Sequence, residues 1–244
     1  MSTTGPVADV HARGGVESEH GSAARRMFDR IAPTYDILNR LMSAGFDRRW
    51  RAQAVAELAA APDGAVLDLC AGTMDLTAMV VRVRPRDRVF ALDFSASMLE
   101  LGRHKAPSAE TVVGDATSLP FFDRSFAAVI CGFGMRNLAD PAAGAREVAR
   151  VLRPGGRFVT LELFRPTRLA TRAFHKTYAR VVLPALGGWL SGEPGAYRYL
   201  AGSMAGFFTR TEYENLLRDA GFVRVRGREL TLGVASIVCG EVQG

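Results

Sequence analysis

The chain has 244 residues, which suits one α/β domain with a single hydrophobic core. Hydrophobic residues make up 48% of it, a share typical of a folded protein, and we expect neither a membrane-spanning run nor a cleaved leader. The formal net charge of +6 favours an anionic partner surface, either nucleic acid or acidic lipid headgroups.

The three cysteines, Cys70, Cys131 and Cys239, lie in apolar, strand-like segments. Their number is odd and their spacing matches no metal-site pattern. We therefore expect these thiols to be reduced and buried. We also expect a cytoplasmic protein that holds no metal.

The chain begins with a segment poor in apolar residues, so residues 1–21 are predicted to be a disordered tail. Apolar residues then recur with helical spacing from 23 to 58, interrupted by Pro33 and Gly45. We predict a helical lid over residues 22–60 at the start of a single domain that spans 22–244.

Strand and helix patterns alternate in the next hundred residues. The predicted strands are 65–70, 88–93, 111–114, 126–131 and 157–163, and the predicted helices are 75–82, 96–104 and 142–151. Such alternation is typical of a doubly wound, mostly parallel, Rossmann-like α/β sheet.

The last part of the chain departs from this alternation. A turn at 152–156 precedes the fifth strand, and residues 164–208 are predicted to be a helical insertion. Thr209 and Glu212 have capping-box spacing at the start of a further helix. Two strands, 222–226 and 230–239, joined by a turn at Gly227, then predict an antiparallel C-terminal strand.

Residues 66–76 form the most informative segment of the sequence. An apolar strand that contains Asp68 leads into a small-residue turn at Gly72 and Thr73, and a helix begins at Asp75. Such a turn lets the backbone approach a nucleotide at the carboxyl end of a sheet. It has one glycine where a dinucleotide fingerprint has three, which favours S-adenosylmethionine (SAM) over a nicotinamide cofactor.

The next strand ends in an acid as well. Asp93 lies 21 residues beyond Gly72, where a carboxylate can accept hydrogen bonds from both ribose hydroxyls of a nucleotide. Ser97 and Glu100 have capping-box spacing in the helix that follows. The alternative is that Asp93 only marks the start of that helix.

Three segments outside the general cofactor motifs resemble one known family. They are residues 27–39 with their continuation 43–51, residues 132–137, and residues 191–200. In these, the chain resembles the ubiquinone/menaquinone biosynthesis C-methyltransferases (the UbiE family), which have the class I SAM-dependent methyltransferase fold. The resemblance runs from about residue 27 to residue 239.

The resemblance implies a set of cofactor contacts. Thr73 is one of them, with its hydroxyl near the methionine carboxylate, and the strand-and-turn pattern adds Asp68 and Gly72 as candidates. Asp93 takes the ribose, and Asp115 with Ala116 takes the adenine, where a carboxylate can accept from the exocyclic amine. Gly132 occupies a position where some members have a serine. A simple loop acid is the alternative for Asp115.

The turn departs from the family pattern at Met74, where a second glycine is usual. If this position needs a positive φ, methionine carries a strain of about 1 kcal/mol or more. Its side chain could also crowd the methionine end of SAM.

The implied reaction is methylation of a ring carbon of a prenylated quinol, demethylmenaquinol to menaquinol. A phenol has a pKa of about 10, so a donor near the ring oxygen is needed to favour the anion. Arg136 and Asn137 are the candidates for this role. Tyr35 and Asp36, on the predicted lid, are secondary candidates. A surface salt bridge is the alternative for Arg136.

A prenylated quinol is confined to the bilayer, so its enzyme must visit the membrane. Four cations recur at every fourth residue of the insertion: Arg168, Arg172, Lys176 and Arg180. In a helix they would form one stripe, which favours contact with anionic lipid at the inner face of the cell membrane. An ordinary solvated helix face is the alternative. We expect nucleic acid less than anionic lipid as the partner of this stripe.

Two other functions remain open on the sequence alone. The chain could methylate another apolar small molecule, such as a polyketide, or act as a non-catalytic scaffold whose cofactor turn Met74 has impaired. The sequence also leaves open the choice of naphthoquinol or benzoquinol, and whether the chain forms a homodimer.

Overall fold

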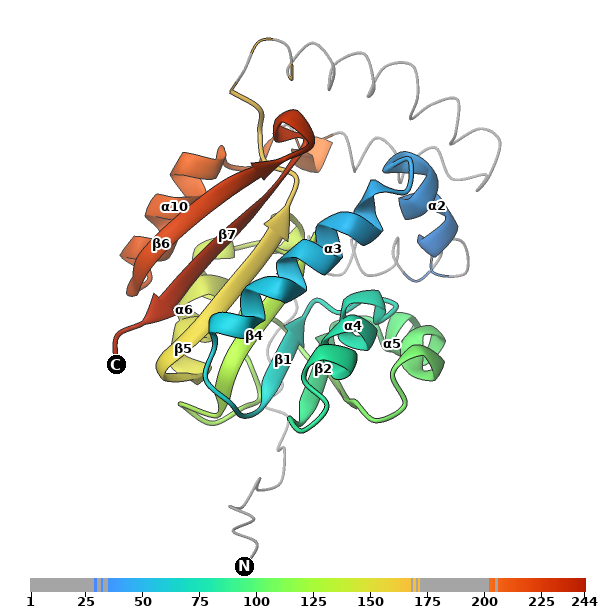
Figure 1. Ribbon diagram of the computed structural model, residues 1–244, viewed down its shortest axis with the longest axis vertical. Coiled ribbons are helices and arrows are strands. Elements are labelled where there is room, and N and C mark those ends of the chain that lie inside the picture. Colours follow the sequence, from blue (N-terminus) through green and yellow to red (C-terminus); the bar gives the residue numbers. More distant parts are fainter. Residues whose placement is uncertain are drawn as a thin grey trace, which may run out of the picture.

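The computed structural model describes residues 29, 32, 35–167, 169, 171, 202–204 and 206–244. The predicted tail at 1–21 and most of the predicted insertion at 164–208 lie outside these residues. Figure 1 shows the described part as a twisted sheet with helices on both faces.

The sheet has seven strands in the order β3-β2-β1-β4-β5-β7-β6. Their bounds are β1 Val66–Leu69, β2 Val89–Asp93, β3 Glu110–Val113, β4 Phe126–Gly132, β5 Leu152–Glu162, β6 Phe222–Leu230 and β7 Ala235–Val242. All pairs from β3 through β5 are parallel, and β7 is antiparallel to both β5 and β6. The predicted antiparallel C-terminal strand is therefore confirmed. The strand order reverses between β1 and β4, and such a switch point is where open α/β sheets bind ligands.

The helices divide between the two faces (Figure 1). They are α2 Tyr35–Met42, α3 Phe46–Ala56, α4 Asp75–Val83, α5 Ala96–Gly102, α6 Pro141–Val151 and α10 Arg210–Asp219. α3, α4 and α5 cover one face, and α6 and α10 cover the other. β2 is buried on both sides, as expected for a central parallel strand. Phe90 and Leu92 point toward α6 and α10, whereas Val89 and Ala91 point toward α4 and α5.

Local signals in the sequence fix most helix starts. Thr209 and Glu212 form the predicted capping box of α10. Asp140 caps α6 by accepting the amides of Ala142 and Ala143, both at 2.9 Å. The prediction for α5 was wrong by two residues, because Ser95 rather than Ser97 accepts the amide of Met98.

The C-terminal hairpin differs from the prediction. Gly227 lies inside β6 and pairs with Val238, and the turn is at Thr231–Gly233. A Cβ atom on Gly227 would lie 2.4 Å from Oε1 of Glu214 in α10. A side chain here would meet the flexible ends of Glu214 and Arg210, so this glycine lies beneath α10 inside the strand and does not mark a chain reversal.

The predicted turn at 152–156 is part of β5. Leu152 pairs with Phe126, and the next pair is Arg157 with Ala128, so the residues between form a bulge. Gly155 has φ +74° within this bulge. The glycines that signalled a turn thus bend the strand without ending it.

Candidate cofactor and substrate site

The turn after β1 contains three residues in the left-handed region of backbone space. Cys70, Gly72 and Met74 have φ of +57°, +52° and +61°. The amide of Met74 donates to the carbonyl of Ala71 at 2.9 Å. This conformation turns the chain sharply from β1 into α4, at the carboxyl edge of the sheet next to the switch point.

Asp93 lies directly beside this turn. Its carboxylate accepts the amide of Gly72 at 2.8 Å and the amide of Ser95 at 2.9 Å. Burial raises the pKa of Asp93 to about 6 although both amides favour its charged form. The structure therefore brings together Gly72 and Asp93, which the sequence analysis predicted as two contacts of one cofactor.

Asp68 is buried under the turn. The hydroxyl of Thr77 donates 2.5 Å to its Oδ2, and Oδ1 has no hydrogen-bond partner among the described residues. Burial raises the pKa of Asp68 to about 7, and the positive charge of Arg51 opposes this rise. A buried acceptor without a partner is costly and therefore calls for an explanation.

Arg51 of α3 approaches the same place, and the sequence reasoning missed it. Within the described ranges its buried Nε atom has no hydrogen-bond partner either. Its NH1 atom lies 3.7 Å from the position that a Cβ on Gly132 would occupy, and its Cζ lies 5.3 Å from the ring centre of Phe133. A Cβ on Gly132 would make an ordinary contact with this guanidinium and a tighter one, 3.1 Å, with Cδ2 of Leu76.

Met74 points away from the turn. Its side chain is fully buried in a small cluster with Ala78, Ala91 and Leu99. The predicted strain requires a positive φ at Met74, and the structure shows one. A residue with a Cβ atom disfavours this left-handed region of backbone space. Burial in the cluster places its side chain among α4, α5 and β2 instead of over the turn.

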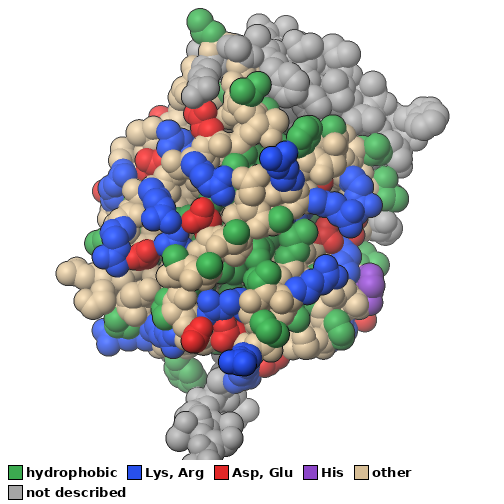
Figure 2. Space-filling model, in the orientation of Figure 1, with side chains coloured by type: hydrophobic (Ala, Val, Ile, Leu, Met, Phe, Trp, Pro, Cys, Tyr) green, Lys and Arg blue, Asp and Glu red, His purple; other side chains and the backbone are tan. Residues whose placement is uncertain are grey.

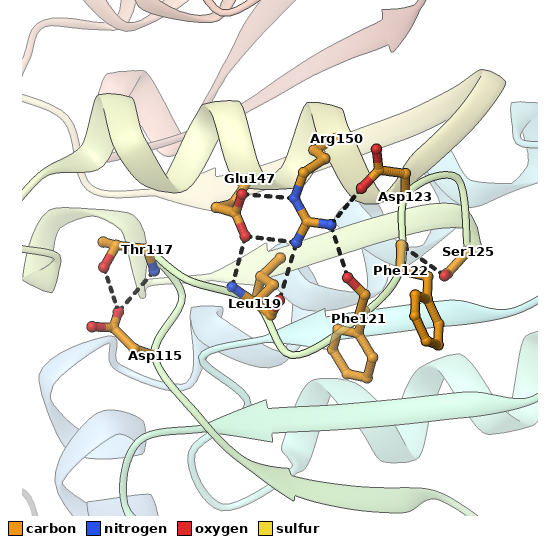
Figure 3. A network of polar contacts seen from close by, with 9 residues as sticks. All are labelled: Asp115, Thr117, Leu119, Phe121, Phe122, Asp123, Ser125, Glu147 and Arg150. Carbon is orange, nitrogen blue, oxygen red and sulfur yellow. Dashed lines mark hydrogen bonds and ion pairs between the residues drawn. The ribbon is translucent and has the colours of Figure 1, made fainter. Parts of the chain in front are cut away.

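The loop that carries Asp115 and Ala116 is held by hydrogen bonds to its own neighbours and to α6 (Figure 3). Asp115 Oδ1 accepts the amide and the hydroxyl of Thr117 at 2.7 and 2.8 Å. Arg150 of α6 donates to the carbonyls of Leu119 and Phe121 at 3.0 and 2.8 Å. These contacts fix the path of the chain between β3 and β4, where Ala116 is buried.

Arg136 lies in a short helix, Met135–Asn137, just beyond β4. Its NH1 atom donates 2.5 Å to Oε1 of Glu162 at the end of β5, and 2.8 Å to the carbonyl of Phe133. The Arg136 side chain is 8% exposed and that of Glu162 is fully buried. Arg136 thus forms a salt bridge, as the alternative held, but the ion pair is buried instead of lying at the surface.

Asn137 is held nearby, since its Nδ2 donates 3.2 Å to the carbonyl of Phe133. Arg136 and Asn137 thus share one backbone acceptor. Glu162 was not singled out from the sequence, and its only signal was an acid near the end of a mostly apolar strand.

Tyr35 and Asp36 form the first turn of α2 and lie over the turn after β1. A Cβ atom on Gly72 would lie 3.9 Å from Cε1 of Tyr35. The hydroxyl of Thr73 donates 2.5 Å to Asp36, which also accepts from Lys105. The two candidate lid residues are therefore placed at the turn after β1.

Charged side chains of both signs are interspersed over β6 and β7 on the face shown in Figure 2. Arg224 forms an ion pair with Glu241 at 2.5 Å. Arg226 and Arg228 share Glu57, at 3.3 and 3.5 Å. Arg157 pairs with the same two glutamates, so four arginines share two carboxylates and this cluster keeps a net positive charge.

Several other predictions concern metal sites, thiols and membranes. The three cysteines are free, and no cluster of potential metal ligands occurs within the described residues. None of the helices in the described ranges is long and apolar enough to cross a membrane. Arg168, Arg172, Lys176 and Arg180 all lie outside the described residues.

Comparisons with solved structures agree with this architecture. A SAM-dependent methyltransferase from Thermotoga maritima matches with a TM-score of 0.64 at 20% identity, over 89% of this chain and 98% of that one. A SAM-dependent methyltransferase from Aquifex aeolicus matches with a TM-score of 0.56 at 17% identity, over 79% and 89%. At this identity the likeness shows the fold, which is that of class I SAM-dependent methyltransferases.

Comparisons of sequence are more specific. A demethylmenaquinone methyltransferase from Thermus thermophilus is 43% identical, over 88% of this chain and 99% of its own length. A demethylmenaquinone methyltransferase from Deinococcus radiodurans is 41% identical over 93% and 95%. A ubiquinone/menaquinone biosynthesis C-methyltransferase UbiE from Syntrophotalea carbinolica is 40% identical over 90% and 94%. Because the profile of the ubiE/COQ5 methyltransferase family also matches residues 16–241, the chain belongs to that family of methyltransferases.

Proposed function

We propose that this protein uses SAM to methylate a ring carbon of a prenylated quinol, with demethylmenaquinol as the acceptor and menaquinol as the product. Relatives named for this activity match nearly the whole chain at about 40% identity, which supports the proposal. The observation that carries it is the buried pair of Arg136 and Glu162, located at the same sheet edge as the Gly72–Asp93 turn.

The residues at this edge fit SAM. Its methionine end carries an ammonium and a carboxylate, and the buried atoms Asp68 Oδ1 and Arg51 Nε offer an acceptor and a donor there. Asp93 would accept from the ribose, and Asp115 with Ala116 would contact the adenine. Gly72 and Thr73 would lie along the methionine end, and Gly132 would leave space beside it. When bound, SAM supplies an electrophilic methyl group on a sulfonium.

The protein's task toward the acceptor is to make a ring carbon nucleophilic. A quinol ring becomes a carbon nucleophile when a hydroxyl loses its proton, and the resulting oxygen anion needs a donor. We assign this role to the guanidinium of Arg136, with Asn137 as a second donor. Glu162 would act as a positioning residue, since its bond to NH1 sets the plane of the guanidinium.

Tyr35 would contact the acceptor or the cofactor from above the turn, because its ring lies over Gly72. We further propose that the enzyme works at the inner face of the membrane, where a prenylated quinol resides. The cationic residues Arg168, Arg172, Lys176 and Arg180 would contribute about 1 kcal/mol each against anionic lipid.

The proposal is tested by supplying methyl-labelled SAM with demethylated naphthoquinol and benzoquinol in separate reactions. Label in either quinol supports the proposal, and the better acceptor identifies the substrate. Calorimetry with SAM alone separates the alternatives. Binding of SAM without transfer to either quinol would point to another apolar acceptor. Absence of SAM binding at millimolar concentration would point to the scaffold role.

A further inference from the structure

Large apolar side chains are exposed beyond the carboxyl edge of the sheet. Of the nine that are exposed among the residues that the structure describes, five come from α2, the start of α3, the segment after β5 and the turn between β6 and β7. These five, between 43% and 83% exposed, are called the apolar rim: Ile37, Leu41, Phe46, Leu169 and Leu232. Figure 1 shows α2 and the turn between β6 and β7 at the upper end of the view, beyond the carboxyl ends of β1 and β5.

Contacts beneath the rim join segments that are far apart in the sequence. Phe46 stacks on Trp50 with ring centres 6.1 Å apart, and Trp50 Nε1 donates to Thr231 Oγ1 at 2.8 Å. The carbonyl of Leu232 accepts from Thr171 Oγ1 at 2.9 Å. The rim is therefore one surface, and a connected apolar surface of this kind marks an interaction site.

The turn that carries Leu232 is strained. Thr231 and Leu232 have φ of +45° and +56°, in a left-handed region that β-branched and bulky residues rarely adopt. Leu232 gains little packing in return, because it is 83% exposed. Strain that the fold tolerates without a packing gain is typical of a residue that acts outside the fold.

Positive charge flanks the rim on α2 and α3. Arg40 lies three residues after Ile37, and Arg49 lies three residues after Phe46, so each shares a side of its helix with a rim residue. Three exposed arginines in these helices form no ion pair with an acid of the described residues and are called the rim cations: Arg40, Arg48 and Arg49. The surface thus combines apolar side chains with unbalanced positive charge.

The rim borders the part of the site that we assign to the acceptor. Trp50, which lies beneath Phe46, packs against Phe133 with ring centres 6.4 Å apart. The carbonyl of Phe133 accepts from both Arg136 and Asn137. Two aromatic rings therefore separate the rim from the proposed donors to the acceptor's oxygen.

We propose that the apolar rim and the rim cations dock the enzyme on an anionic bilayer, with the rim side chains in the acyl region and the cations at the headgroups. For its purpose the inference rests on the proposed acceptor, since a prenylated quinol resides in the bilayer. Surfaces of this composition bind membranes through buried apolar area and attraction to anionic lipid. Docking here turns the acceptor side of the site toward the membrane, so the ring reaches Arg136 while the tail stays in lipid.

Flotation with vesicles of phosphatidylcholine and phosphatidylglycerol tests the apolar part. Leu232→Asn combined with Ile37→Gln should lower the partition coefficient by about tenfold or more, because two apolar side chains no longer enter the acyl region. Asparagine tolerates a positive φ, so Leu232→Asn should not lower the thermal stability. Phe122→Gln is the matched control, since Phe122 is 65% exposed just before β4, at the opposite edge of the sheet. Its partition coefficient should stay within about twofold of wild type.

The cations are tested with the same vesicles. Arg40→Gln and Arg49→Gln should each weaken binding about fivefold, and neither should change binding to vesicles of phosphatidylcholine alone. Arg86→Gln is the control, because Arg86 is exposed between α4 and β2, at the opposite edge of the sheet. Its binding should stay within about twofold of wild type.

Kinetics separate docking from chemistry. With a prenylated quinol in vesicles, the double variant should raise KM by about tenfold or more, while its kcat on a tail-less quinol in solution stays within about twofold. Vesicle binding that the rim variants leave unchanged would overturn the inference and leave the proposed function standing. A wild-type dimer that Leu232→Asn dissociates in sedimentation without lipid would also overturn it, since a second copy would then cover the rim. Rim-dependent vesicle binding by a protein that methylates neither quinol would overturn the proposed acceptor and keep the docking surface.

Discussion

The amide of Gly72 donates a 2.8 Å hydrogen bond to the carboxylate of Asp93, which ties the turn after β1 to the tip of β2. The register of the sheet explains this contact. Asp68 pairs with Ala91, so both strands end at the same level of the carboxyl edge. The acid that we assign to the ribose therefore also shapes the turn that we assign to the methionine end.

Asp93→Ala should consequently affect both the cofactor and the fold. We expect SAM affinity to fall by about 1.5–3 kcal/mol, because bonds to a charged acceptor are lost. The unfolding free energy should also fall, by about 1–3 kcal/mol, since two buried amides lose their acceptor. Calorimetry and urea denaturation measure the two effects.

Asp87→Ala is the matched control for that variant. Asp87 accepts the amide of Gly64 at 3.1 Å, before β2 and at the opposite edge of the sheet. The Asp87→Ala protein should be less stable than wild type and should keep its SAM affinity. Equal SAM affinity in folded Asp93→Ala and wild type would remove Asp93 from the cofactor site.

The stability of the ligand-free protein should depend on pH through Asp68. Its folded pKa of about 7 lies above the ordinary value near 3.9, so the folded state binds the proton more tightly. This tighter proton binding contributes most to the unfolding free energy below about pH 4, and the contribution is lost as the pH rises to about 7. Asp68→Asn does not titrate, so its stability relative to wild type should increase by about 2–4 kcal/mol between pH 4 and 8. Urea denaturation at both pH values measures this, and a constant difference would contradict it.

Met74→Gly tests the balance between strain and packing in the turn. The change relieves about 1 kcal/mol of left-handed strain but removes a fully buried side chain, which costs about 2–5 kcal/mol. We therefore expect a net loss of about 1–4 kcal/mol in unfolding free energy, with little change in SAM affinity. A glycine variant of equal or greater stability would show that strain is the larger effect.

Arg136→Lys should lower turnover by about 100-fold or more, because a point charge does not reproduce a planar donor fixed by Glu162. SAM affinity should hardly change. The activity profile should move to higher pH, because the quinol hydroxyl ionises less readily without its donor. Steady-state kinetics across pH measure the turnover and its pH profile, and calorimetry measures the SAM affinity.

Arg84→Lys provides the control for a conservative change at a largely buried arginine. Arg84 pairs with Asp87 at 2.5 Å and donates to the carbonyl of Leu58 at 3.1 Å, away from the site. It should lose stability and keep its turnover and pH profile. Near-normal turnover in Arg136→Lys would leave that residue with a structural role only.

Local patterns in the sequence were sufficient to predict the central strands, most helices and the positions of Gly72 and Asp93 at the carboxyl ends of two strands. These features depend on hydrophobic periodicity and on the parallel order of the strands. Gly227 was misread as a turn because close packing and chain reversal both select glycine. Its neighbour in space, Glu214, is not a neighbour in sequence.

Arg51, Glu162 and Lys105 could not be assigned from the sequence for a related reason. Each is an ordinary charged residue in its own segment and becomes distinctive only through a distant contact. Glu162 meets Arg136, 26 residues away, and Lys105 meets Asp36, 69 residues away. Without tertiary structure nothing separates them from solvated surface charges.

We propose that the methyl group goes to a ring carbon and that Arg136 supports this transfer. The most direct measurement is a reaction of the protein with demethylmenaquinol and SAM labelled with ¹³C in the methyl group, followed by NMR of the product. We expect a labelled methyl bonded to a ring carbon in the wild type and a greatly reduced yield in Arg136→Lys. A labelled methoxy group, or no labelled quinol from a folded protein that binds SAM, would contradict it.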